Sequence, residues 1–139
     1  MQRAQLATKS GAFSAHAGVV CVFLCRGAPA ELELKLLAVH FHDTYGQALS
    51  NSLTALMEGV TTIDSSIGGL GGCPFAQSAT GNLATEDLVW QLHGMGISTG
   101  INFEELLKTS QWLGEKSSLT IRSKVAIALS NKKGMAERL

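Results

Sequence analysis

Residues 35–63, KLLAVHFHDTYGQALSNSLTALMEGVTTI, contain the alternation that decides the fold. Residues 35–41, apolar except for Lys35 and His40, predict a buried strand, and residues 60–63 predict a second, shorter one. Between them, residues 47–58 place leucines at helical spacing, and Gly59 is expected to end that helix. A strand, a helix and a strand in succession indicate an α/β fold.

Three further helices are predicted after this stretch. Residues 84–95 place apolar side chains on one face, with Glu86 and Asp87 in the first turn, where the helix dipole favours acids. Asn102, followed three residues later by Glu105, has the pattern of a capping box at the start of the next helix. The last helix is expected over residues 122–130.

The composition excludes several classes of protein. The chain has 139 residues, is 45% hydrophobic and carries 11 basic and 11 acidic side chains, which fits one globular domain. A net charge of zero argues against binding to nucleic-acid phosphates. The longest uncharged apolar stretch, residues 18–25, is far shorter than the roughly 20 residues of a membrane-spanning helix. Three cysteines without a CxxC pair argue against a disulfide framework.

Charge separates the first 30 residues from the rest. Residues 1–30 carry three basic side chains and no acid, whereas residues 31–139 carry eleven acidic and eight basic side chains. We therefore expect an N-terminal segment over residues 1–30 and one domain over residues 31–139. The segment has features of a transit peptide or a secretory signal, although Pro29 is unfavourable in a cleavage tripeptide. A segment without a targeting role is an equally good interpretation.

A histidine pair is the first candidate for chemistry. His40 and His42 lie at the end of the strand predicted over residues 35–41. Residues two apart in a strand point to the same face, so both imidazoles can meet one divalent metal ion. Two structural histidines, hydrogen-bonded at a sheet edge, remain an alternative interpretation.

A glycine-rich loop and an asparagine are the second and third candidates. Residues 68–72 contain four glycines and lead into Cys73, which such a loop could deliver to a site as a proton donor or nucleophile. A turn with a passive cysteine is an equally good interpretation. Asn82 precedes the helix predicted over residues 84–95, where its amide oxygen could bind a metal or cap the helix.

Together these stretches resemble the C-terminal part of the hydroxymethylglutaryl-CoA lyase family. The resemblance is carried by LAVHFHDTYGQALSNSLTAL at residues 37–56, by VTTIDSSIGGLGGCPFAQSATGNLATEDLVWQLHGMGI at residues 60–97 and by TGINFEELL at residues 99–107. HxHDTYGQA, GLGGCP and GNLATEDLV in one chain distinguish this family from related synthases and carboxyltransferases. The fold implied is the C-terminal portion of a TIM (β/α)₈ barrel, incomplete in this chain.

The resemblance implies a metal-dependent carbon–carbon lyase of leucine degradation and ketone-body formation. Such a lyase cleaves 3-hydroxy-3-methylglutaryl-CoA to acetyl-CoA and acetoacetate by a retro-Claisen reaction. Implied for this chain are His40, His42 and Asn82 as ligands of Mg²⁺ or Mn²⁺, and Cys73 and His40 as catalytic residues. We further expect Asp43 and Glu86 to orient the ligands or the base of the loop.

Partners and compartment follow from the same resemblance. The substrate is an acyl-CoA, with no nucleic acid or membrane partner, and a homodimer or association with a full-length subunit is expected. The compartment implied is the cytoplasm in a bacterium or the mitochondrial matrix in a eukaryote.

One departure from the family keeps two alternatives open. The family's first-strand motif, similar to RDGLQ, supplies an arginine and an aspartate ligand, and residues 1–30 contain no counterpart. The chain could therefore be a truncated, catalytically inactive fragment, or a partial barrel that docks on a full-length subunit.

Overall fold

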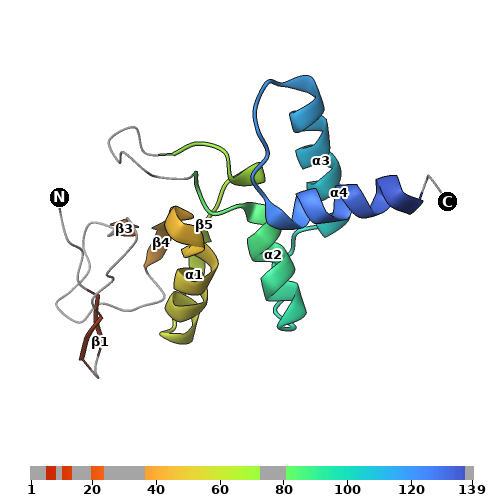
Figure 1. Cartoon of the computed structure of the whole chain (residues 1–139). Helices are drawn as coiled ribbons and strands as arrows, with labels where there is room; N and C mark the ends of the chain where they lie inside the picture. Colours follow the sequence, from red (N-terminus) through yellow and green to blue (C-terminus); the bar gives the residue numbers. More distant parts are fainter. Residues whose placement is uncertain (1–5, 9–10, 14–19, 24–36, 73–80, 137–139) are drawn as a thin grey trace. The chain divides into compact units, whose positions relative to one another are not determined.

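The computed structural model describes residues 6–8, 11–13, 20–23, 37–72 and 81–136, and their side chains within 37–72 and 81–131. The chain divides into two compact units (Figure 1). The first contains Met1–Asp64 with Gly72–Thr80, and the second contains Ser65–Gly71 with Gly81–Leu139. The boundary expected near residue 30 lies outside the described residues, so the division into residues 1–30 and 31–139 stays a prediction.

The first unit is built on a three-stranded sheet with the order β3-β4-β5. Its strands are β3 (Val20–Phe23), β4 (Ala38–Phe41) and β5 (Thr62–Asp64). The strands β4 and β5 are parallel and are connected through helix α1 (Ala48–Met57), so the predicted strand, helix and strand are all present. The α/β class is thereby confirmed. A second pair of strands, β1 (Leu6–Thr8) and β2 (Gly11–Phe13), is antiparallel.

Strand β3 runs antiparallel to β4. All strands of a (β/α)₈ barrel are parallel, so β3 does not follow the barrel pattern. The residues of β3 precede the stretch that carries the family resemblance. The parallel part of this sheet therefore consists of β4 and β5.

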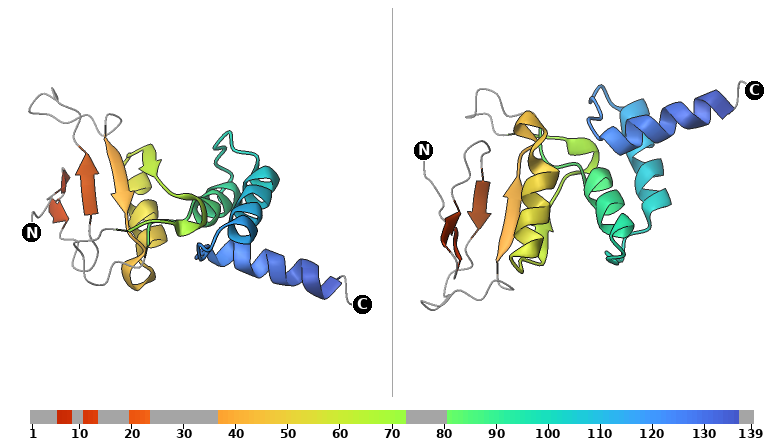
Figure 2. Two further views of the ribbon diagram at one scale, coloured as in Figure 1. Left: turned by 90° about the horizontal axis from the view of Figure 1, so that it is seen from above. Right: turned by 60° about the horizontal axis from the view of Figure 1, so that its bottom comes forward.

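Burial explains why α1 packs on β4 (Figure 2). Val39 and Phe41 of β4 are buried, and α1 buries Ala48, Ser52 and Ala55 on one face. The leucines that predicted this helix flank that face and are half-buried, because the small side chains allow the closest approach to the sheet. The Ser52 hydroxyl donates to the Ala48 carbonyl at 2.8 Å, which satisfies its buried polar group.

The second unit contains three helices and a short 3₁₀ turn, η3 (Ile67–Gly69). The helices are α2 (Thr85–Gly94), α3 (Phe103–Lys116) and α4 (Lys124–Ala136). One parallel bridge joins Ser66 to Ala84. The apolar core of this unit contains Leu83, Ala84, Leu88, Val89 and Ala126. Within the described residues, no helix has both the length and the apolar character to cross a membrane.

Side-chain caps determine where α3 and α4 begin. The Asn102 side chain accepts hydrogen bonds from the amides of Glu104 and Glu105, at 3.1 and 3.2 Å, which confirms the predicted start of α3. Helix α4 begins at Lys124, two residues after the predicted position. The reason is Ser123, whose hydroxyl accepts from the Ala126 amide at 3.0 Å and therefore acts as the N-cap.

Candidate functional site

Strand β4 brings the two candidate histidine ligands together. The ring centroids of His40 and His42 are 5.2 Å apart, with the rings edge to face at 73°. The period-two geometry of the strand end accounts for this arrangement. His42 is 5% exposed, whereas the side chain of His40 is 25% exposed, so one ring is buried and the other is open to solvent.

Asp64 is a residue of this region that the sequence reasoning missed. The parallel register of β4 and β5 places Asp64 opposite His40, and its Oδ2 lies 3.8 Å from the Nδ1 of His40. This distance exceeds that of a direct hydrogen bond, and the Asp64 side chain is 51% exposed. The available signal was its position directly after the strand predicted over residues 60–63, since the ends of neighbouring parallel strands lie at one sheet edge.

Asp43 connects the end of β4 to the start of α1. Its Oδ1 accepts a hydrogen bond from the amide of Ala48, the first residue of the helix, at 3.2 Å. The turn between them includes Tyr45 at a φ of 57° and Gly46 at a φ of 71°. The carboxylate therefore stabilises the turn that follows the histidine pair.

Asn82 belongs to the second unit and is held by the glycine-rich loop there. Its Nδ2 donates to the Leu70 carbonyl at 2.9 Å. Its Oδ1 is buried and accepts no hydrogen bond from any described residue. Asn82 does not cap α2, whose N-cap is Ala84. Of its two interpretations from sequence, the capping role is therefore not realised.

Glu86 anchors the base of the same loop. The residue is 0% exposed, and the Gly68 amide lies 2.9 Å from both of its carboxylate oxygens. Its position in the first turn of α2 favours a negative charge, because the helix N-terminus presents unsatisfied amides. A buried carboxylate thus fastens the glycine loop to the helix that follows Asn82.

Asp87, next to Glu86, fastens α4 in the same way. Its carboxylate accepts from the Ser123 hydroxyl at 2.6 Å and from the amides of Lys124 and Val125 at 3.1 and 2.9 Å. This one buried carboxylate therefore satisfies the first two amides of α4 and also accepts from the hydroxyl of the residue before them. The two acidic residues predicted in the first turn of α2 are therefore both tied to other segments of the unit.

The residues that could hold a metal fall into two sets. His40 and His42 offer imidazole nitrogens in the first unit, and Asn82 offers a buried amide oxygen in the second. Imidazole nitrogens and amide oxygens both occur among the ligands of divalent ions such as Mn²⁺. Among the residues that the structure describes, no three His, Cys, Asp or Glu side chains cluster in a way that could hold a metal ion. Cys73 lies outside the described residues.

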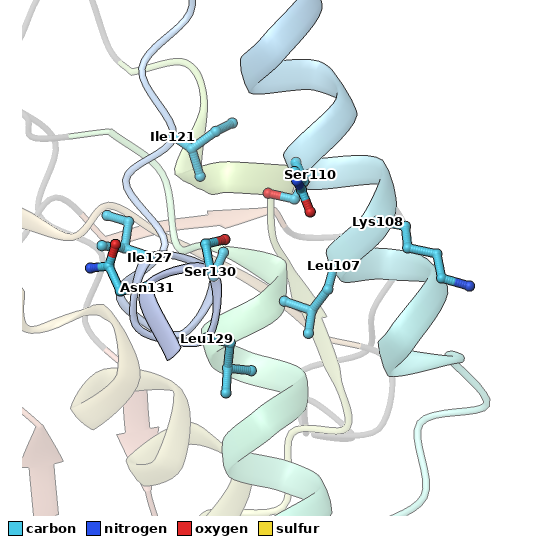
Figure 3. Close-up of a pocket in the computed structure, with 10 residues that line it drawn as sticks. Leu107, Lys108, Ser110, Ile121, Ile127, Leu129, Ser130 and Asn131 are labelled. Atoms are coloured by element: carbon cyan, nitrogen blue, oxygen red, sulfur yellow. The ribbon is translucent and has the colours of Figure 1, made fainter. Parts of the chain in front are cut away.

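A groove of about 240 Å³ lies between α3 and α4 (Figure 3). Leu107, Ile121 and Leu129 contribute apolar surface to it. Neither Asn82 nor Glu86 belongs to its lining, so this groove is separate from the candidate ligand of the same unit.

Known proteins share sequence and structure with this chain. The family model described as HMGL-like matches residues 25–113. The chain belongs to the HMGL-like family. Within the family, it is 56% identical over 98 residues to the mitochondrial hydroxymethylglutaryl-CoA lyase of Homo sapiens, a match that covers 70% of this chain and 30% of that protein.

Solved structures of HMGL-like relatives agree with this assignment. The hydroxymethylglutaryl-CoA lyase of Pseudomonas aeruginosa is 45% identical with a TM-score of 0.68, over 74% of this chain and 34% of that one. An HMG-CoA lyase of Acinetobacter baumannii, solved with coenzyme A and 3-methylmalate, is 40% identical with a TM-score of 0.66, over 70% and 32% of the two chains. The HMGL-like chain described here therefore spans about a third of the length of these relatives.

Proposed function

We propose that this chain carries the histidine and cysteine part of a metal-dependent carbon–carbon lyase acting on 3-hydroxy-3-methylglutaryl-CoA. The products are acetyl-CoA and acetoacetate. The observation that carries the proposal is the pairing of His40 with His42, 5.2 Å apart, in a chain of the HMGL-like family. Relatives named as this lyase support the substrate, and the solved complex with coenzyme A supports an acyl-CoA.

The fold proposed for residues 31–139 is the C-terminal portion of a TIM barrel. Two features support it: the parallel pair of β4 and β5 connected through α1, and the parallel bridge between Ser66 and Ala84. In such barrels the catalytic groups lie at the carboxyl ends of the strands. His40, His42 and Asp64 occupy that position in their strands, which fits the proposal.

The proposed ligands of a divalent ion, Mg²⁺ or Mn²⁺, are His40, His42 and Asn82. The buried Oδ1 of Asn82, which accepts no hydrogen bond from a described residue, supports its inclusion. When bound, the ion orients the substrate and polarises its oxygens. Asp64, 3.8 Å from Nδ1 of His40, favours the tautomer with a proton on Nδ1 and leaves the Nε2 lone pair available.

The remaining residues act on protons and on geometry. In the cleavage, the tertiary hydroxyl of the substrate loses its proton, the bond to the acetyl-CoA carbon breaks, and the carbonyl of acetoacetate forms. The electron pair of that bond passes to the thioester enolate, which takes up a proton to become acetyl-CoA. We assign that proton transfer to the Cys73 thiol and assign His40 to the reacting hydroxyl. Glu86 keeps the base of the loop that leads to Cys73 attached to α2.

The test is acetoacetate release from 3-hydroxy-3-methylglutaryl-CoA by the purified chain, with Mn²⁺ and again with a chelator. Release that the chelator abolishes supports the proposal. His42→Ala should abolish it, whereas His93→Ala, which removes a histidine whose ring bonds Thr99 at 3.0 Å, should not. No release from a folded sample would overturn the activity. Size-exclusion chromatography with a full-length HMG-CoA lyase would then distinguish an inactive fragment from a docking partial barrel.

A further inference from the structure

We propose that Gly71 is a positioning residue for Asn82. Its lack of a side chain leaves room for the Leu70 carbonyl to hold the Asn82 amide in the orientation that keeps Oδ1 available to a divalent cation. This inference rests on the metal site proposed above.

The orientation of the amide follows from its one described hydrogen bond. The Leu70 carbonyl accepts from Nδ2 at 2.9 Å. Because a carbonyl can only accept, it selects the NH₂ side of the amide and directs Oδ1 away. Oδ1 is buried, and no described residue donates to it. A buried oxygen left unpaired costs about 1–3 kcal/mol, so an Oδ1 that no described residue satisfies points to a ligand.

Gly71 is the position where a side chain would disturb this amide. A Cβ at Gly71 would lie 2.9 Å from Nδ2 of Asn82 and 4.0 Å from its Cγ. Real Cβ atoms do not approach a heavy atom this closely, so the amide would have to turn or move. At Gly81, by contrast, a Cβ would lie 2.6 Å from the Gly69 carbonyl oxygen, which is backbone. A side chain at Gly81 would therefore clash with the main chain, whereas the absence of one at Gly71 leaves space for the Asn82 side chain.

Backbone strain needs its own control, because Gly71 has a φ of +87°. Any L-residue with a side chain is strained in that region. Gly96 has a φ of +77°, belongs to the same unit, and has nothing within 4 Å of the position of a Cβ. Gly96→Ala thus introduces similar strain without touching Asn82.

The experiment measures the Mn²⁺ affinity of the chain by calorimetry. The variants are Gly71→Ala, Gly96→Ala, Asn82→Ala and the double variant of Gly71 and Asn82. We expect Gly71→Ala and Asn82→Ala each to weaken binding about tenfold or more, and Gly96→Ala to change it less than about twofold. The double variant should bind as weakly as Asn82→Ala alone, because Gly71 acts through Asn82.

A second readout needs no metal. In ¹H–¹⁵N spectra, the Asn82 side-chain NH₂ pair should show the slowed exchange of a hydrogen-bonded, partly buried donor. The chemical shifts of this NH₂ pair should change in Gly71→Ala and stay unchanged in Gly96→Ala. If Gly71→Ala does not fold, the exchange rate in the unsubstituted chain decides, and a rapidly exchanging NH₂ pair would overturn the inference.

The outcomes separate the two proposals. Mn²⁺ affinity unchanged by Asn82→Ala would overturn both the metal site and the role of Gly71. Weaker binding in Asn82→Ala, with Gly71→Ala equal to Gly96→Ala, would overturn the role of Gly71 alone. A double variant whose Mn²⁺ affinity falls by the product of the two single effects would also overturn the role of Gly71.

Discussion

The two units of the chain position their candidate ligands by different means. In the first unit, the period-two geometry of the strand puts His40 beside His42, and the register of β4 with β5 puts it opposite Asp64. In the second unit, Asn82 depends on a loop of glycines at positive φ and on a carboxylate, Glu86, that fastens that loop. A ligand pair within one strand is specified locally, whereas a ligand held by a loop requires contacts from distant positions. Substitutions should therefore affect the two regions differently.

The largest expected effect separates the proposed metal ligands from Cys73, the residue proposed for proton transfer. Cys73→Ala should lower turnover by about 10²–10⁴-fold, the usual contribution of a general acid, and leave Mn²⁺ affinity unchanged. Steady-state kinetics and calorimetry on one preparation measure both quantities. Normal turnover in Cys73→Ala would remove the thiol from the mechanism.

The next effect tests whether the second unit depends on its buried carboxylates. Asp87→Ala leaves the Ser123 hydroxyl and the amides of Lys124 and Val125 without this acceptor. We expect a loss of about 3 kcal/mol in the free energy of unfolding, measured with urea. Asp64 belongs to the first unit and its side chain is half-exposed, so Asp64→Ala should change the free energy of unfolding by less than about 0.5 kcal/mol. Equal losses in the two variants would contradict the comparison.

A smaller effect tests how the first unit orients His40. Asp64→Asn removes the charge that lies 3.8 Å from Nδ1 of His40. Outer partners of metal-bound histidines typically contribute 10–100-fold to metal affinity, and this distance predicts the lower end, about tenfold. Glu58→Gln is the matched control, since Glu58 is another exposed acid of the unit. If both variants bind Mn²⁺ equally well, Asp64 does not orient the ligand.

The smallest effect concerns an exposed ion pair of the second unit. Glu105, 2.7 Å from the Lys108 ammonium, raises the pKa of Lys108 above its ordinary value of 10.5 by hydrogen bonding and by charge. A raised pKa in the folded state stabilises the fold below 10.5, and this contribution is lost as the pH rises through the folded pKa. The stability difference between the chain and Lys108→Gln should therefore shrink from pH 9 to pH 12. A difference that grows with pH would contradict this sign.

Local patterns account for the elements that could be predicted. The spacing of leucines located α1 to within one residue at each end, and Asn102 located the start of α3. These signals are local, because a helix and its cap involve residues only a few positions apart. Helix α4 begins two residues after its expected start, because Asp87 and Ser123, 36 positions apart, determine that start together.

The sequence by itself determined the α/β class, the family and the histidine pair, since each depends on residues close together in the chain. Only the tertiary structure decided that Asp64 lies opposite His40 and that Leu70 holds the Asn82 amide. The same holds for Glu86, which binds Gly68 from 18 positions away. Strand register and loop packing bring these groups together. Hydrophobic periodicity carries no information on which polar atoms will meet once the apolar faces are buried.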